Sequence, residues 1–226
     1  MIRTVAATLL LFALSGCCGA PGPVLPVPTP LQAAFDQHDA LAIADALEGL
    51  IADGKDTERD RQLAYEHVTK KEEPTAAYAF ARATVAGRLV QTRGLTAAFL
   101  VREMEAWAQK SVQLDPDFRQ GAGLRMLGTL YVLAPASLLR NGDSEKGLAL
   151  LEGLVKARPD TIVNHLRYAE ALIALGDPEP ATESLCRCVA RKAELRKDEQ
   201  SLVDKLVQDA GAPACPGAAP ASPAAP

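Results

Sequence analysis

Aromatic side chains are scarce in this sequence. They make up 4% of its 226 residues, with a single tryptophan, whereas hydrophobic residues as a whole make up 48%. A core with few aromatic residues and abundant alanine favours closely packed helices over a β-sandwich. An excess of basic residues is also missing, because 24 Lys and Arg face 28 Asp and Glu and the net charge is −4. Nucleic acid, which is normally bound by a basic patch, is therefore not an expected partner.

Familiar motifs of catalysis are missing too. The sequence contains no Gly-x-Ser-x-Gly and no His-Glu-x-x-His, and its three histidines lie far apart. We expect His165 to be packed in the core, and His38 and His67 to be solvated. The acidic residues Glu103 and Glu105 are interpreted as ordinary exposed helix positions. They are two residues apart and therefore do not share a helix face, as a catalytic pair would require. The sequence thus predicts no enzyme activity, no cofactor and no metal site.

Residues 1–16 are interpreted as a signal peptide. Arg3 supplies a positive charge, and Val5–Leu14 is an apolar run of ten residues broken only by Thr8. A membrane-spanning helix needs about 20 such residues, so the run fits the apolar region of a signal peptide better. The run ends in Leu14-Ser15-Gly16-Cys17, which resembles the bacterial lipobox and implies lipidation of Cys17. The alternative is a plain secretory signal that is cut after a small residue.

The residues on either side of the central region are expected to form a tether and a tail. The lipidated segment 17–30 is rich in proline, with five prolines and two glycines between residues 19 and 30, so it predicts an extended spacer. Residues 211–226 are rich in Pro and Ala and predict a flexible tail. Cys18, and not Asp, follows Cys17. In the lipoprotein class that the lipobox implies, this favours the outer membrane, with the protein facing the periplasm and held by its lipid anchor alone.

Residues 31–210 are predicted to form one all-α domain. Apolar residues recur with helical spacing throughout, and no convincing strand pattern interrupts them. Glycine and proline divide the region into helices of 12–20 residues with short loops, which implies antiparallel neighbours. The expected helices cover residues 31–52, 57–72, 74–91, 95–114, 118–133, 143–157, 161–175, 178–195 and 198–209.

Two segments of this domain share a register. Gly128 and Tyr131 are followed by Gly147 in the first segment, and Ala169 is followed by Gly176 and Ala181 in the second. This pattern resembles the tetratricopeptide repeat (TPR), in which small residues let two paired helices approach closely. The resemblance implies antiparallel helix pairs stacked as a short TPR-like α-solenoid, with these six residues at packing positions.

A longer stretch, about residues 75–195, resembles the TPR-like periplasmic lipoproteins associated with TRAP transporters, the T component. The likeness is carried by Gly142-Asp143, Lys146, Tyr168-Ala169-Glu170 and Gly176-Asp177, and by an insertion at residues 134–140. It implies a periplasmic solute-binding protein as partner. Leu138, Leu139 and Arg140 in the insertion are candidate partner-binding residues. The insertion equally fits a purely structural reading, in which it caps the helix above it.

The cysteines predict one disulfide in the oxidising envelope. Cys186 and Cys188 lie two residues apart on a predicted helix, so they do not pair easily with each other. We expect Cys186 to pair with Cys215, with a Cys188–Cys215 bridge as the alternative. Cys188 lies on the packing stripe and is interpreted as a small buried hydrophobic residue.

Together these observations predict an envelope lipoprotein that acts as a helical-repeat protein-interaction module, as an accessory component of a TRAP-type solute uptake system. The alternative is a periplasmic carrier of a small hydrophobic ligand or lipid, whose helices would enclose an apolar cavity. Homo-oligomers are left open, because the end faces of a short solenoid need covering.

Overall fold

The structure, a computed structural model, describes residues 26–213 and 215. In this part of the chain it contains ten α-helices, three short 3-10 helices and no strand. The α-helices are α1 Thr29–Gln37, α2 Ala40–Ala52, α3 Glu58–Thr69, α4 Ala76–Arg93, α5 Ala98–Leu114, α6 Ala122–Leu133, α7 Ser144–Ala157, α8 Ile162–Ala174, α9 Pro178–Ala190 and α10 Lys197–Asp209. The 3-10 helices are η1 Gly94–Ala97, η2 Ala136–Leu138 and η3 Lys192–Glu194.

Helices adjacent in sequence pack as antiparallel pairs. The most extensive contacts join α4 to α5, α6 to α7 and α8 to α9, and α5 and α7 then pack on α6 and α8 of the following pairs. These are the pairs that the repeat register predicts. The fold class is therefore confirmed as an all-α, TPR-like solenoid.

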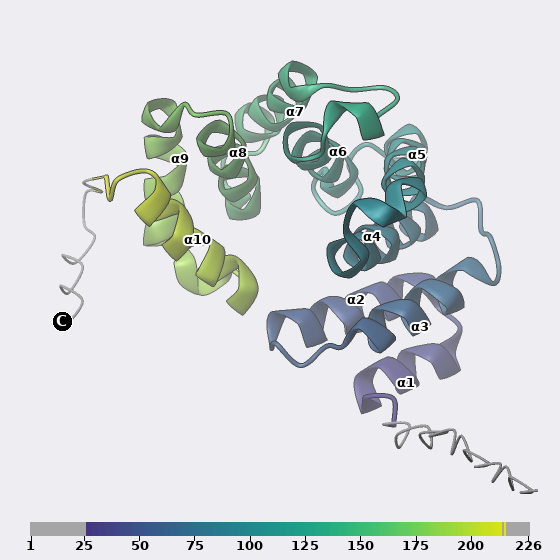
Figure 1. The fold of residues 1–226 in the computed structure, drawn as a ribbon. Helices are drawn as coiled ribbons and strands as arrows, with labels where there is room; N and C mark the ends of the chain where they lie inside the picture. Colours follow the sequence, from purple (N-terminus) through teal and green to yellow (C-terminus); the bar gives the residue numbers. More distant parts are fainter. Residues whose placement is uncertain (1–25, 214, 216–226) are drawn as a thin grey trace, which may run out of the picture.

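The solenoid curves until its two ends meet. Figure 1 shows the helices following one another around an open centre, from α2 and α3 through α6 and α7 to α10. The last helix, α10, contacts α2. At this junction Lys197 Nζ lies 2.6 Å from a carboxylate oxygen of Asp53. The protein is thus a closed ring of helices, and its concave surface faces inward.

Glycine allows the helices α6 and α7 to pack backbone against backbone. A Cβ atom at Gly128 would lie 2.6 Å from Leu151 Cγ and 3.0 Å from the carbonyl oxygen of Gly147. A Cβ at Gly147 would lie 2.8 Å from both the carbonyl oxygen of Gly128 and Tyr131 Cβ. Both positions require glycine for close approach, which is the role that the repeat pattern gives them.

The equivalent positions of the next pair behave differently. Ala169 on α8 and Ala181 on α9 are completely buried in a cluster with Leu166 and Leu185. Gly176 does not pack two helices, since no atom lies within 4 Å of a Cβ placed there. It follows the end of α8 with a φ of 84°, a left-handed conformation that favours glycine. Gly176 therefore ends a helix and is not a packing residue.

The first predicted helix, 31–52, is two helices. His38 ends α1 in a left-handed conformation with a φ of 55°. Asp39 then caps α2, because its side chain accepts hydrogen bonds from the backbone N–H groups of Leu41 and Ala42 at 2.8 and 3.1 Å. The apolar residues continue across this break, and for that reason periodicity alone did not reveal it.

Other boundaries also differ from expectation. The predicted helix 95–114 begins with the 3-10 helix η1 and is α-helical only from Ala98, and the predicted helix 57–72 ends at Thr69. The predicted helix 118–133 begins only at Ala122, because Arg119, Gln120 and Gly121 all have positive φ values. The predicted helix 178–195 ends at Ala190 and is followed by η3. The predicted signal peptide, the lipidation site Cys17 and most of the tether and tail lie outside the described residues. Within the described residues, no helix combines the length and apolar character that crossing a membrane requires.

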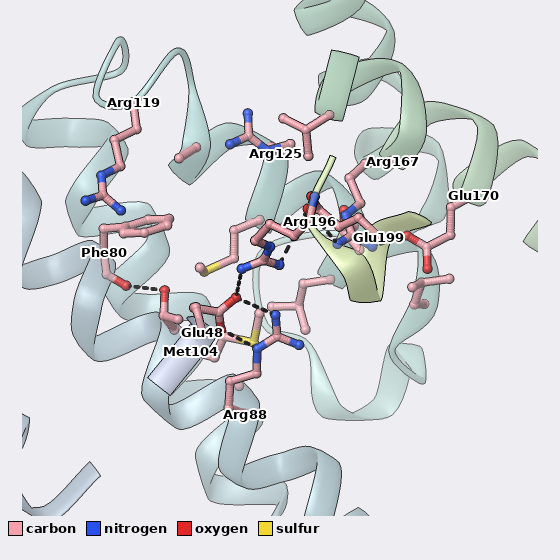
Figure 2. A pocket seen from close by; sticks show the side chains of 18 of the residues that line it. Glu48, Phe80, Arg88, Met104, Arg119, Arg125, Arg167, Glu170, Arg196 and Glu199 are labelled. Atoms are coloured by element: carbon pink, nitrogen blue, oxygen red, sulfur yellow. Dashed lines mark hydrogen bonds and ion pairs between the residues drawn. The ribbon is translucent and has the colours of Figure 1, made fainter. Parts of the chain in front are cut away.

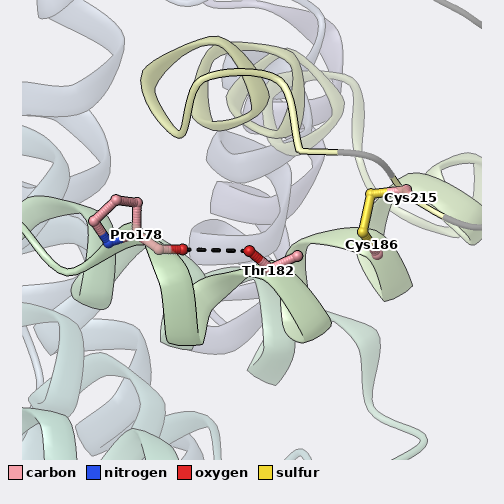
Figure 3. Close-up of a disulfide and its surroundings, with 4 residues drawn as sticks. All are labelled: Pro178, Thr182, Cys186 and Cys215. Carbon is pink, nitrogen blue, oxygen red and sulfur yellow. Dashed lines mark hydrogen bonds between the residues drawn. A yellow bond between two sulfur atoms is a disulfide. The ribbon is translucent and has the colours of Figure 1, made fainter.

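A disulfide joins Cys186 on α9 to Cys215, beyond α10 (Figure 3). Their Cα atoms are 5.1 Å apart. This is the first of the two pairings that the sequence left open. Cys188 is a fully buried free thiol, and burial raises its pKa to about 12. It is therefore an inert core residue near neutral pH.

Candidate binding cavity

The inner side of the ring forms a cavity of about 1160 Å³ that is open to solvent on one side. Its lining comes from both halves of the chain, with residues of α2 and α4 facing residues of α8 and α10, and with α5 and α6 between them. Small-molecule sites in proteins are typically about 300–1,000 Å³. The space is therefore large enough for a ligand of considerable size.

One side of the cavity is apolar. Val101 and Met104 of α5 face Met126, Leu130 and Leu133 of α6 across this part of the wall. Leu133 is 47% exposed although it is a large hydrophobic residue, so it lies where the cavity meets solvent. An apolar wall of this kind favours the hydrophobic portion of a ligand.

The remainder of the wall is charged. Most of its arginines are paired with carboxylates: Arg119 with Asp45, Arg167 with Glu170, and Arg191 with Glu194. The described residues place six arginines and six carboxylates in the lining, namely Arg88, Arg119, Arg125, Arg167, Arg191 and Arg196, and Asp45, Glu48, Asp160, Glu170, Glu194 and Glu199.

Glu48 joins the two ends of the ring at the cavity wall. Arg88 of α4 donates two hydrogen bonds to its carboxylate, at 2.5 and 2.6 Å, and Arg196 just before α10 donates another (Figure 2). Burial by itself raises the pKa of Glu48, but the two guanidinium groups outweigh it and hold the pKa below its ordinary value. Glu48 is thus an ionised structural link between α2, α4 and α10.

Arg125 on α6 is different from the other arginines of the wall. Its guanidinium donates a hydrogen bond of 2.7 Å to Asn164 Oδ1, and no carboxylate among residues 26–213 and 215 pairs with it. Burial lowers its pKa to about 10, and the nearby charge of Arg167 contributes in the same direction. Arg125 therefore remains a cation at neutral pH, held partly out of water by the fold.

The three candidate partner-binding residues are not one surface. Leu138 lines the cavity, whereas Leu139 packs inward against the cluster that contains Leu127 and Tyr131. The side chain of Arg140 is exposed. The insertion thus contributes Ala134, Pro135 and Leu138 to the cavity lining, and Leu139 caps the helix packing.

Glu105 was misinterpreted from the sequence. It is only 1% exposed, and its two carboxylate oxygens accept hydrogen bonds from the backbone N–H groups of Arg140 and Asn141 at 2.9 and 2.8 Å. Glu103 is also largely buried, since it pairs with Arg82 at 2.7 Å and accepts a hydrogen bond from Tyr65. Both carboxylates are therefore structural, and Glu105 fixes the start of the turn that follows the insertion.

The histidines fall into two environments. His165 is 3% exposed, with Nδ1 3.0 Å from Ser184 Oγ and Nε2 2.8 Å from the carbonyl oxygen of Pro159, as expected for a core histidine. His38 is exposed, but His67 is half-buried and stacks on Phe35 with ring centroids 3.8 Å apart. None of them lies in the cavity wall.

No sequence motif identified the cavity arginines. The partner of Arg196 is 148 residues away in sequence, so their proximity depends on closure of the ring. Arg125, Thr129 and Leu133 do recur every four residues on α6, which is a weak signal of a shared face. Among the described residues, no group of three or more His, Cys, Asp or Glu is placed to hold a metal ion.

Comparisons of the chain with protein-family models and with curated protein sequences gave no match.

Proposed function

We propose that this protein is a lipid-anchored binding protein of the bacterial envelope that holds a small, largely apolar ligand inside its ring. The observation that carries the proposal is the cavity of about 1160 Å³, bounded by α2 and α4 on one side and by α8 and α10 on the other, with α5 and α6 between them. The lipobox-like segment at Cys17 supports an envelope location. Of the two functions inferred from the sequence, this geometry favours the carrier.

The charged wall supports binding and not turnover. General acid–base catalysis needs a group that exchanges its proton near the working pH. Glu48, Glu170 and Glu194 are each paired with an arginine. The pKa values of Glu48 and Glu194 lie below their ordinary value, Glu48 because Arg88 and Arg196 outweigh burial and Glu194 chiefly through its hydrogen bond from Arg191. We accordingly assign the protein no catalytic step.

The test is to isolate the protein gently from cell envelopes and analyse it by native mass spectrometry and solvent extraction. We expect one small molecule per chain. Thr129 lines the cavity, so Thr129→Trp would project an indole ring into the space and weaken binding. Thr92 is exposed on α4, and Thr92→Trp is the matched control that should retain the ligand. An empty wild type, or equal occupancy in both variants, would contradict the proposal.

A second role, as the accessory T component of a TRAP-type uptake system, rests on the family resemblance and on the cavity mouth. Leu133, 47% exposed, and Leu138 present apolar surface where the cavity opens. A periplasmic solute-binding protein that docks there would receive or deliver the ligand directly.

This docking role has its own matched pair of variants. Leu114 at the end of α5 is also 47% exposed, but it does not line the cavity. We expect Leu133→Arg to prevent capture of the solute-binding protein in a pull-down, and Leu114→Arg to leave capture intact. Equal capture by both variants would place the docking surface elsewhere.

A further inference from the structure

The cavity contains a cation, Arg125, that no carboxylate in the described part of the chain neutralises. The carboxylates near Arg125 are engaged by other arginines, since Glu199 and Glu170 both interact with Arg167. Arg167, Arg196 and Arg158 add positive charge around Arg125, and Glu199 alone opposes them noticeably. Keeping a desolvated charge unpaired costs several kcal/mol unless an opposite charge is supplied. The site is therefore electrostatically suited to an anion.

Unused hydrogen-bonding groups lie beside this cation. Thr129 follows Arg125 by one helical turn and also lines the cavity, and its buried hydroxyl has no hydrogen-bond partner among the described residues. Asn164, which is completely buried, accepts from Arg125 through Oδ1. In the described part of the chain its Nδ2 is likewise without a partner, but Asn164 does not line the cavity, so of these two residues only Thr129 can contact a ligand there. A native fold leaves few such groups unsatisfied, and each one calls for an explanation.

The polar site continues directly into the apolar wall. Arg125, Thr129 and Leu133 lie on one face of α6, and a rise of 1.5 Å per residue separates the Cα atoms of the first and last by about 12 Å. Leu130 on the same helix and Val101 and Met104 on α5 complete the apolar end. Figure 2 shows Arg125 and Met104 among the side chains around the cavity. Along this axis the wall changes from cationic to hydrophobic.

We propose that the ligand is an amphipathic anion whose acidic head binds Arg125 and, after rotation of the Thr129 side chain toward the cavity, the Thr129 hydroxyl, and whose hydrocarbon body lies against Val101, Met104, Leu130 and Leu133. This inference rests on the proposed carrier function and adds the chemical class of the cargo. A neutral lipid would leave Arg125 uncompensated, and a cationic amphiphile would be repelled by the surrounding arginines. A carboxylate or a phosphate monoester has the required charge and acceptor oxygens.

Calorimetric titration of the purified full chain with decanoate, decyl phosphate and decanol tests this assignment. We expect both anions to bind about tenfold or more tightly than decanol, because a hydrogen bond to a charged group is worth about 1.5–3 kcal/mol. Tighter binding of decanoate would indicate a free organic acid as cargo. Tighter binding of decyl phosphate would indicate a lipid phosphate.

Variants at the two ends of the cavity separate charge recognition from general binding. Arg125→Gln should weaken decanoate binding by about tenfold to a hundredfold and leave decanol binding unchanged. Arg125→Lys should retain most of the preference for the anion. Arg187 is paired with Glu183 on the exposed face of α9 and does not line the cavity, so Arg187→Gln is the matched control and should change neither affinity.

The outcomes distinguish this inference from the carrier proposal. If decanol binds as tightly as decanoate to the wild type, the anion assignment is wrong and the carrier proposal stands. If none of the three probes binds, both are wrong. Should Arg125→Gln fail to fold, Thr129→Val provides the test, because it keeps the shape of the side chain and removes the hydroxyl donor. An unchanged ratio of decanoate to decanol affinity in that variant would count against the proposed head site.

Discussion

At the scale of single residues, we expect the buried carboxylate of Glu105 to contribute strongly to the stability of the fold. It receives two backbone N–H groups from the turn at Arg140 and Asn141, and it is almost inaccessible to solvent. We expect Glu105→Ala to lower the free energy of unfolding by about 2–4 kcal/mol, since two charge-assisted hydrogen bonds are lost and both donors stay buried. Urea unfolding measures the loss.

A local readout accompanies that measurement. Hydrogen exchange at the amides of Arg140 and Asn141 should accelerate strongly in Glu105→Ala. Glu105→Gln keeps one acceptor oxygen and should lie between the wild type and the alanine variant. Unchanged exchange at both amides would mean that Glu105 does not hold the turn.

A pH effect is expected at His165. Its burial lowers the pKa below the ordinary value, outweighing the hydrogen bond to the carbonyl oxygen of Pro159. The unfolded chain therefore binds a proton at His165 more readily than the folded protein does. The stability associated with His165 is fully present above its unfolded pKa of about 6.5 and decreases as the pH falls below that value.

Urea titrations at pH 7.5 and pH 5 measure this effect. His165→Gln should lose less stability between the two pH values than the wild type does. If the wild type and His165→Gln change in parallel, the histidine is not responsible.

At the scale of helices, glycine controls the contact between α6 and α7. A methyl group at Gly128 would overlap Leu151 and approach the backbone of Gly147. We expect Gly128→Ala to cost about 1–3 kcal/mol of stability, which is typical when a tightly packed contact is overfilled. Thermal and urea unfolding both report this loss.

The same helix pair offers a control glycine. At Gly153 on α7 no atom lies within 4 Å of an added Cβ. Gly153→Ala should therefore be neutral or stabilise the protein by up to about 1 kcal/mol, since alanine favours the helix. Equal destabilisation by both substitutions would show that close approach is not what Gly128 provides.

The helices and their pairing were largely predictable because both depend on local patterns. Apolar periodicity and glycine or proline boundaries located most elements, and the small residues Gly128 and Gly147 indicated which helices pair. The break at His38 was missed, because Asp39 caps α2 within an uninterrupted apolar pattern. Glu105 was missed because its partners are backbone groups of a turn 35 residues further along the chain.

The candidate site was less predictable for the same reason. An ion pair such as that between Arg196 and Glu48 cannot be predicted from the sequence, because the two residues become neighbours only when the ring closes. Among the described residues no carboxylate pairs with Arg125. This depends on which side chains the folded chain places around it, and the sequence pattern does not reveal that. The sequence pattern points instead to Leu138, Leu139 and Arg140 in the insertion, and of these three only Leu138 lines the cavity.

At the scale of the whole molecule, Glu48 controls closure of the ring. Glu48→Ala would leave Arg88 and Arg196 close together without the carboxylate that they share. We expect a loss of about 3 kcal/mol, as is typical when one partner of a largely buried ion pair is removed. The radius of gyration measured by X-ray scattering should increase as α10 separates from α2.

Glu183 provides the control for closure. It pairs with Arg187 on the exposed face of α9, where its side chain is 80% accessible. Glu183→Ala should change neither stability nor dimensions appreciably, because exposed ion pairs contribute little. Should the Glu48 variant keep the dimensions of the wild type, the ion pairs would not be what holds the ends together.

Closure also restricts how this architecture can change in length. An open solenoid tolerates an extra repeat, because each repeat contacts only its neighbours and the array simply grows. Here α10 must return to α2, so duplicating α6 and α7 would rotate and displace one terminus away from the other. The number of repeats is accordingly fixed by geometry, and a tandem duplication that is harmless in an open array would disconnect this one.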